Sequence, residues 1–458
     1  MRMATVYRPE ACWVGGEVKR GAELCVGDDG RVLATAPAGA EVVALPGRVL
    51  LPGFVNGHSH AFQRVLRGRT EFLAPGHERD DFWSWREAMY AAATTLSPDD
   101  LYVVSRQAFL EMALAGITTV GEFHYLHHQS DGTPYADEHE LALRVISAAR
   151  DVGLRIVLLR VVYARAGFQV QPNPRQQRFL DPDAATSLRR ATELAARVAR
   201  DPLVSVGLAP HSVRAVPLPW LAELSRGWPS GPLHMHVAEQ PAEVKACLEE
   251  HQRRPVELLN DAGLLSERFT AVHAIHLERG EVERLARTGA TVCACPSTER
   301  NLGDGVVPAD ELLAAQVPIS LGSDSQAHID LLDEARQLEG HLRLVRQRRN
   351  VLDPRKGQPE GLGRRLLQCL TSSGARSLGV NAGGLNPGES ADFVTLSLAH
   401  PSLVGAPEGL EPALALGASS AAVRDVAVAG RLVVKDGHHA AEDAVARDFS
   451  ACVRRLYG

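Results

Sequence analysis

Eight short apolar runs alternate with amphipathic segments through the middle of this chain, and this alternation constrains the fold more than any other feature. Segments such as 101–115, 139–152, 183–200, 241–262 and 279–288 have the pattern of helices. Strands that alternate with helices form parallel sheets, in which each helix crosses from one strand to the next. The eight predicted strands lie at 50–56, 117–123, 155–162, 203–209, 233–237, 270–275, 290–295 and 317–322.

Eight such units over roughly 330 residues predict a (β/α)8 TIM-type barrel. An open doubly wound sheet is the alternative that strand count alone leaves open, although no Gly-x-Gly-x-x-Gly phosphate-binding sequence follows any of the runs. The two ends of the chain are rich in β-type runs instead. We therefore predict a small β-sandwich domain built from both termini (1–50 and 384–445), a barrel at 51–383 and a C-terminal helical tail at 446–458.

Composition limits the partners of the chain. Its 49 basic and 55 acidic side chains give a net charge of −6, which argues against a nucleic-acid or anionic-membrane partner. No apolar window reaches the ~20 residues of a membrane span, and the first residues lack the apolar core of a signal peptide, so we expect a cytoplasmic protein. The seven cysteines have no framework spacing and predict reduced thiols, with Cys293 and Cys295 buried and inert.

Polar residues that can bind a metal recur where the predicted strands end, which is where barrel enzymes carry their chemistry. The first strand ends in His58-Ser59-His60, and residues i and i+2 of a strand point to the same side. Each histidine alone is more often structural, and Asp324 alone would be read as a helix N-cap. The recurrence is harder to explain by packing, and the later strands end in or near His211, His236, Glu239, His273, His276 and Asp324.

Three imidazoles and a carboxylate suit zinc, with one position left for water. On the fifth strand His234 and His236 share a face, and we select His236 because it is nearer the strand's end. Glu239 follows three residues later, where a carboxylate beside a metal-activated water could shuttle protons. A salt-bridge role is the alternative for Glu239.

The order His-x-His, His, His, Asp resembles the amidohydrolase superfamily over nearly the whole chain. The segments 51–56 (Leu-Pro-Gly-Phe-Val-Asn) and 388–394 (Gly-Glu-Ser-Ala-Asp-Phe-Val) also match. The resemblance implies one zinc ion held by His58, His60, His236 and Asp324. It also implies that Glu239, His273 and Asp324 are catalytic, with His273 preferred over His276 because it matches the family's position.

Lysine usage narrows the resemblance. Many superfamily members hold two metals bridged by a carbamylated lysine on the fourth strand. The only lysines here are Lys19, Lys245, Lys356 and Lys435, so no lysine lies on that strand. The mononuclear, deaminase-like branch therefore fits better.

Within that branch, three segments resemble the formimidoylglutamate deiminases of histidine degradation: 58–64, 211–216 and 295–305. Ser297 stands where those enzymes usually have threonine, which is a conservative change. The resemblance implies hydrolysis of N-formimidoyl-L-glutamate to N-formyl-L-glutamate and ammonia by a homodimer. It places five residues around this dicarboxylate substrate: Gln63, Arg86, Tyr125, His211 and Arg214.

Three other functions are weighed against this one. A deaminase of guanine or a related purine would favour stacking aromatics over paired arginines. A hydrolase that releases formamide and glutamate from the same substrate belongs to a family with another fold and a two-manganese site. A non-catalytic scaffold would not need every expected ligand position to be filled, as it is here.

Overall fold

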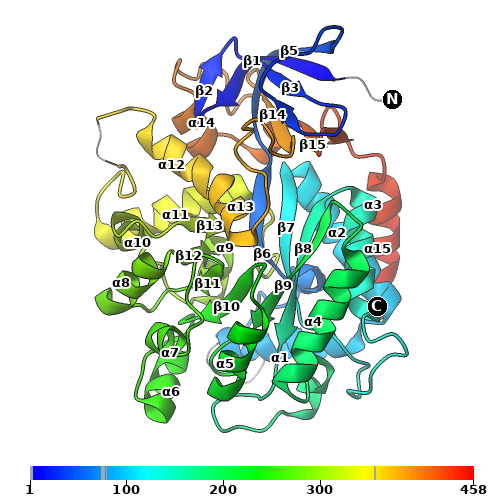
Figure 1. Cartoon of the computed structure of the whole chain (residues 1–458), viewed down its shortest axis with the longest axis vertical. Coiled ribbons are helices and arrows are strands. Elements are labelled where there is room, and N and C mark those ends of the chain that lie inside the picture. The colour runs from blue at the N-terminus through cyan, green and yellow to red at the C-terminus, as the bar shows by residue number, and fades with distance from the viewer. Residues whose placement is uncertain (1–3, 74–77, 79, 355–356) are drawn as a thin grey trace.

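The computed structural model describes residues 4–73, 78, 80–354 and 357–458, so the first three residues and Lys356 lie outside the described residues. Its centre is a sheet of eight parallel strands that pair in chain order (Figure 1). All eight predicted strands are present: β6 (Phe54–Ser59), β7 (Ile117–His124), β8 (Arg155–Val162), β9 (Val204–Pro210), β10 (Leu233–Val237), β11 (Phe269–His273), β12 (Thr291–Ala294) and β13 (Ile319–Leu321).

The two edges of this sheet meet at residues that are expected from the sequence to bind a metal. The His60 N–H donates to the Asp324 carbonyl, and the Asp324 N–H donates to the His58 carbonyl, each at 3.0 Å. These bonds join the end of β6 to the segment after β13 and close the strands into a barrel. The predicted (β/α)8 barrel is confirmed, and the open doubly wound sheet is not what forms.

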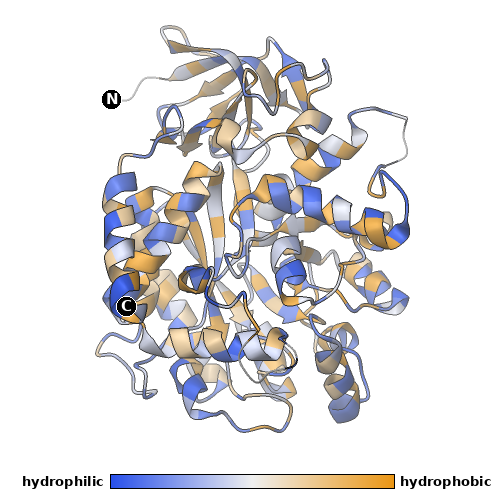
Figure 2. Cartoon of the chain, turned by 180° about the vertical axis from the view of Figure 1, so that it is seen from behind, coloured by the Kyte–Doolittle hydropathy of each residue, from blue (hydrophilic) through white to orange (hydrophobic). Residues whose placement is uncertain are grey.

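Helices surround the barrel, with apolar and polar residues alternating along them in Figure 2. Side-chain caps fix several helix starts, such as Ser97, which forms a reciprocal capping box with Asp100. The surrounding helices are α2 (Pro98–Leu114), α3 (Glu140–Val152), α4 (Ala184–Val198), α5 (Leu218–Gly227), α6 (Pro241–His251), α7 (Pro255–Asp261), α8 (Arg279–Thr288), α9 (Pro296–Leu302), α10 (Ala309–Ala314), α11 (Leu331–Arg346) and α12 (Gly361–Cys369).

The helix expected over 241–262 is two helices. α6 ends where Gln252 adopts a left-handed backbone with φ of +54°, and α7 starts with Pro255 at its first position. A proline in the middle of a helix lacks the N–H that the helix needs, whereas at the first turn that N–H has no partner to lose. The periodicity of the sequence continues across this break, so it predicted a single helix.

Both ends of the chain build a second, curled sheet beside the barrel (blue and orange in Figure 1). Its core includes Tyr7, Leu50 and Phe393. The strands are β1 (Thr5–Val14), β2 (Glu17–Arg20), β3 (Leu24–Val26), β4 (Val32–Leu33), β5 (Glu41–Pro52), β14 (Phe393–Ser397), β15 (Val423–Val428) and β16 (Arg431–Val434). The run expected as one strand at 50–56 is divided at Gly53 between this sheet and the barrel.

This second sheet lies toward the amino ends of the barrel strands, since β5 leads directly into β6. The short helix α13 (Ser372–Leu378) packs at the same end, where the Ser377 carbonyl accepts a hydrogen bond from His234 Nε2 at 2.7 Å. The opposite, carboxyl ends of the strands are covered by the 3₁₀ helices η1 (Ala61–Leu66) and η2 (Pro174–Phe179) and by α1 (Phe82–Thr95).

The remaining helices are α14 (Glu411–Leu416), η3 (Ser420–Ala422) and α15 (Glu442–Tyr457), which packs on α2. Within the described part of the chain, no helix combines the length and the apolar character that crossing a bilayer requires. All seven cysteines are buried and none is in a disulfide, as their spacing predicted.

Candidate metal centre and active site

Four side chains from distant parts of the chain converge at the carboxyl end of the barrel. The Nε2 atom of His58 lies 3.2 Å from the Nε2 atoms of both His60 and His236. Asp324 Oδ1 lies 3.4 Å from His58 Nε2 and 3.3 Å from His60 Nε2. All four ligand atoms are buried and lie within 4.8 Å of one another. The ligand set expected from the sequence therefore faces a single point.

The protonation of these side chains suits a metal. The Nδ1–H groups of His60 and His236 each donate to a backbone carbonyl at 3.0 Å, those of Phe123 and His211. These bonds leave the Nε2 lone pairs directed at the shared point. Burial lowers the pKa of all three histidines, to about 3 for His60, so the imidazoles are neutral, as metal binding requires.

The spacing of the ligand atoms also suits zinc. Zn–N and Zn–O bonds of roughly 2.0–2.2 Å in a tetrahedral site place neighbouring ligand atoms about 3.3 Å apart. Burial would raise the pKa of Asp324, but its contacts with His58, His273 and His60 lower it, so the carboxylate is ionised. The set thus offers three neutral nitrogens and one anionic oxygen to a divalent cation.

His273 and Glu239 border this centre. His273 Nε2 lies 3.6 Å from both Glu239 Oε1 and Asp324 Oδ2. His273 and Asp324 have φ angles of +69° and +45°, and Ala238, next to Glu239, has +51°. A left-handed backbone is costly for residues other than glycine and tends to occur at functional sites. The strands therefore end here in strained turns that direct these side chains inward.

Glu299, which was not identified from the sequence, contacts the Nδ1 side of the His273 ring, opposite the Nε2 atom that faces Glu239 and Asp324. The Glu299 carboxylate is buried, and its Oε1 accepts the Cys295 N–H at 2.8 Å and lies 3.3 Å from His273 Nδ1. Burial would lower the pKa of His273, yet the carboxylates of Glu239, Glu299 and Asp324 together raise it well above its ordinary value. Glu299 lies in the segment 295–305 that carries the family resemblance, but no spacing rule pointed to its partner.

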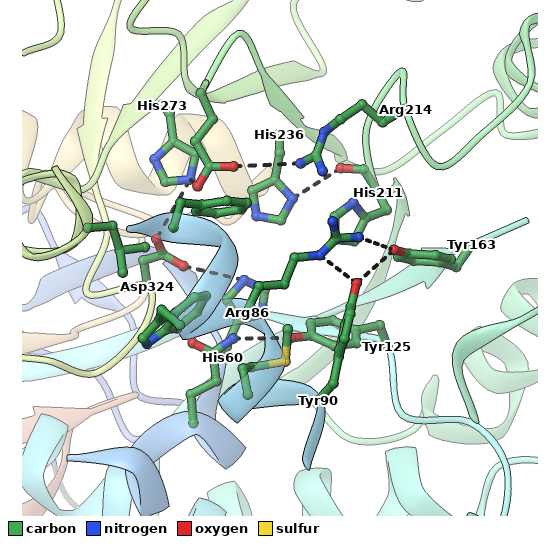
Figure 3. Close-up of a pocket in the computed structure, with 16 residues that line it drawn as sticks. His60, Arg86, Tyr90, Tyr125, Tyr163, His211, Arg214, His236, His273 and Asp324 are labelled. Carbon is green, nitrogen blue, oxygen red and sulfur yellow. Dashed lines mark hydrogen bonds and ion pairs between the residues drawn. The ribbon is translucent and has the colours of Figure 1, made fainter. Parts of the chain in front are cut away.

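A pocket opens beside these candidate metal ligands (Figure 3). Gln63 lies on η1 and Arg86 on α1, whereas Tyr125, His211 and Arg214 follow β7 and β9. Gln63 Nε2 donates to the Tyr125 hydroxyl at 3.1 Å. All five residues expected near the substrate line this pocket, together with His60, Phe82, Trp85, Met89, Tyr90, Tyr163, His236, Glu239, His273, Leu302 and Asp324.

The family model described as "Amidohydrolase family" matches residues 49–433, which include every strand of the barrel. The chain belongs to the amidohydrolase family. It is 41% identical to a formimidoylglutamate deiminase from Pseudomonas aeruginosa over 88% of each chain. It is 30% identical to an 8-oxoguanine deaminase from the same organism, over 90% of this chain and 89% of that one. A crystal structure of an amidohydrolase from Brucella melitensis is 34% identical with a TM-score of 0.90, over 99% and 100% of the two chains.

The two arginines in the pocket of this amidohydrolase have different partners. Arg214 Nε donates to the buried Glu243 carboxylate at 3.2 Å, and Arg214 Nη2 lies 3.8 Å from Glu239 Oε2. The Arg86 guanidinium is held by the hydroxyls of Tyr90 and Tyr163, and no carboxylate of the described residues pairs with it. The positive charge of Arg86 is therefore the less compensated of the two.

Other polar residues of the amidohydrolase barrel lie outside the pocket. His276 Nε2 donates to the Asp304 carbonyl at 2.9 Å, and His276 does not line the pocket. Cys295 Sγ lies within 4.8 Å of ligand atoms of His273 and Asp324, but burial raises the pKa of its thiol well above the usual value. Cys295 is thus a protonated, buried side chain, as is expected of a structural cysteine.

Glu122 is a second residue that sequence reasoning left without a role. Its carboxyl group accepts the Ser59 hydroxyl at 2.6 Å and the Ala61 N–H at 2.8 Å. These contacts hold the residues on either side of His60 from the neighbouring strand β7. Burial raises the pKa of Glu122 to about 8.

Proposed function

We propose that this amidohydrolase is a zinc-dependent deiminase that hydrolyses N-formimidoyl-L-glutamate to N-formyl-L-glutamate and ammonia. The observation that carries the proposal is that Arg86 and Arg214 line one pocket with a zinc-type ligand set. Arginine is the side chain best shaped to bind a carboxylate through bidentate hydrogen bonds, and the substrate has two carboxylates. The relative that is 41% identical bears the name of this activity, which supports the proposal.

One zinc ion per chain is proposed to be held by His58, His60, His236 and Asp324. When bound, zinc supplies a Lewis acid that makes water nucleophilic near neutral pH. The substrate's formimidoyl carbon is attacked by water, the C–N bond to the terminal nitrogen breaks, and that nitrogen leaves as ammonia. The remaining oxygen becomes the formyl carbonyl, so atoms balance without any further reactant.

The chain's own residues are proposed to move the protons. Asp324, which is ionised, accepts a proton from the attacking water, and His273, whose pKa is raised, orients that water, since Asp324 Oδ2 and His273 Nε2 lie 3.6 Å apart on the pocket wall. Glu239 passes a proton to the departing nitrogen. Burial raises the pKa of Glu239, against the opposing effects of His273 and Arg214, which suits a carboxyl group that must hold a proton.

Gln63, Arg86, Tyr125, His211 and Arg214 are proposed to bind the substrate. Their side chains supply amide, guanidinium, hydroxyl and imidazole groups around a pocket that His60, His236 and Asp324 also line. A buried donor that loses its acceptor is costly, so such a pocket discriminates strongly against a substrate without carboxylates.

The direct test is ammonia release from N-formimidoyl-L-glutamate, compared with guanine, 8-oxoguanine and 5-methylthioadenosine. We expect activity on the first alone, with formylglutamate rather than glutamate and formamide as products. Arg214→Ala is expected to keep its zinc and lose most of its kcat/KM, whereas Arg253→Ala, on an exposed surface pair, is the matched control. Ammonia from a purine but none from formimidoylglutamate would overturn the proposal, and a chain that retains no zinc would favour a scaffold.

The setting of the enzyme is also a proposal. We propose a cytoplasmic homodimer with no nucleic-acid or membrane partner, in which residues 1–50 and 384–445 form one domain, residues 51–383 the barrel and residues 446–458 a tail. The net charge of −6 supports the absence of a nucleic-acid partner. Sedimentation of the purified protein tests the dimer.

A further inference from the structure

We propose that Tyr90, Tyr163 and Gln176 complete, with Arg86, a binding seat for one substrate carboxylate, in which every polar group still available to a ligand is a hydrogen-bond donor. The identity of the ligand rests on the proposed function, but the seat itself follows from the hydrogen bonds of these four side chains. Three of them, Arg86, Tyr90 and Tyr163, line the pocket, and their contacts are drawn in Figure 3.

The guanidinium of Arg86 is positioned by neutral groups. Its Nε donates to the Tyr90 hydroxyl at 2.6 Å, and its Nη2 donates to the Tyr163 hydroxyl at 3.2 Å and to the Ala166 carbonyl at 3.5 Å. Its Nη1 has no hydrogen-bond partner among the described residues. Arg86 therefore keeps two N–H groups and an uncompensated charge for a ligand.

Gln176 determines which way the two tyrosine hydroxyls point. Its Oε1 accepts the Asn173 N–H at 3.1 Å, and this bond fixes the orientation of the amide. Gln176 Nε2 must then face the tyrosines, and it donates to the Tyr90 hydroxyl at 3.1 Å and the Tyr163 hydroxyl at 2.9 Å. Each hydroxyl oxygen thus accepts one hydrogen bond from Gln176 and one from Arg86.

The two tyrosine hydroxyls retain a proton that a ligand can accept. A tyrosine hydroxyl has one proton and can accept two hydrogen bonds. The oxygens of Tyr90 and Tyr163 each accept two already, so neither can accept a further one. The two hydroxyls lie 3.3 Å apart and can share at most one proton between them. At least one O–H therefore has no acceptor in the described part of the protein. Burial raises the pKa of Tyr90, which keeps its proton in place.

The charges of the pocket favour an anion at this corner. Arg214, the other arginine, already pairs with Glu243 and lies near Glu239, whereas the partners of Arg86 among the described residues are all neutral. A carboxylate accepts several hydrogen bonds and carries a negative charge that would pair with the Arg86 guanidinium. It is therefore the chemical group that satisfies all the free donors together. A flat uncharged base would leave the half-buried guanidinium without a counter-charge.

The test measures binding of glutarate, a plain dicarboxylate, to the zinc-loaded enzyme by titration calorimetry. Tyr163→Phe removes one donor and is expected to raise the Kd roughly 10- to 100-fold, the range for a hydrogen bond to a charged group. Gln176→Glu has the same shape but accepts the tyrosine protons and repels the ligand, so its loss is expected to exceed that of Tyr163→Phe. Tyr102→Phe, which removes a tyrosine hydroxyl bonded to Asp151 outside the pocket, is the control.

Melting temperatures separate a binding defect from a folding defect. We expect Tyr163→Phe to melt near the wild type, and Tyr90→Phe serves in its place if Tyr163→Phe does not fold. A glutarate Kd unchanged within about twofold in both Tyr163→Phe and Gln176→Glu would overturn the seat, as would failure of the wild type to bind glutarate. Glutarate binding that depends on these residues in an enzyme that releases no ammonia from formimidoylglutamate would leave the seat standing and refute the proposed function.

Discussion

Glu299 offers the sharpest test of how the site works, because a single oxygen of its carboxylate contacts two groups. Oε1 accepts the Cys295 N–H at 2.8 Å and lies 3.3 Å from His273 Nδ1, and the side chain is buried. A positioning residue of this kind fixes which imidazole nitrogen carries the proton and stabilises the charged ring. We predict that substitutions here damage catalysis through His273 without removing the metal.

The expected magnitude follows from these contacts. Glu299→Leu leaves the His273 ring N–H without its charged acceptor, which is worth about 1.5–3 kcal/mol, or roughly 10- to 150-fold in kcat/KM. It also leaves the Cys295 N–H buried and unpaired, a further ~1–3 kcal/mol of lost stability. Glu299→Gln keeps an acceptor oxygen but not the charge, so its loss should be near ~1 kcal/mol, or about fivefold.

The assay is steady-state ammonia release, with zinc content and melting temperature measured on the same samples. The loss should appear in kcat more than in KM, because Glu299 does not line the pocket. Glu283→Gln, which removes a charge from an exposed surface pair, is the control. A folded, zinc-loaded Glu299→Leu enzyme with kcat/KM within about twofold of the wild type would refute the positioning role.

Two further predictions concern pH and metal. Burial raises the pKa of Glu334 well above its usual 4.5, despite a hydrogen bond from the Ser297 N–H, so the folded protein holds this proton more tightly than the unfolded chain. The resulting stability is full below pH ~4.5 and declines as pH rises toward the folded pKa, and Glu334→Gln should remove the decline. The melting temperature of Glu334→Gln, relative to that of the wild type, should therefore increase as pH rises from about 5 to about 8. Curves of melting temperature against pH that run parallel for the two proteins would contradict this. Separately, chelation should abolish ammonia release and lower the melting temperature, with both restored by zinc but not in His236→Ala, and activity that survives complete metal removal would contradict the site.

The barrel could be predicted from the sequence because its strands are buried on both faces. Such strands appear as continuous apolar runs between amphipathic helices, and all eight were found within a few residues. The exception is the run at 50–56, which looks like one strand but serves two sheets. The division is at Gly53, where an added Cβ would lie 2.3 Å from the Thr118 side chain, a close approach that only the packed structure reveals.

By itself the sequence determined the strands and the residue types at their carboxyl ends, because a strand's period of two places His58 and His60 on one side and a parallel barrel gathers its strand ends. It did not determine Glu299, Glu122 or Gln176 as partners of the site. These residues lie on α9, β7 and η2, and each contacts its partner across a gap in the sequence that no periodicity encodes. Hydrogen bonds between side chains depend on distances of a few tenths of an ångström, and only the folded barrel brings those atoms together.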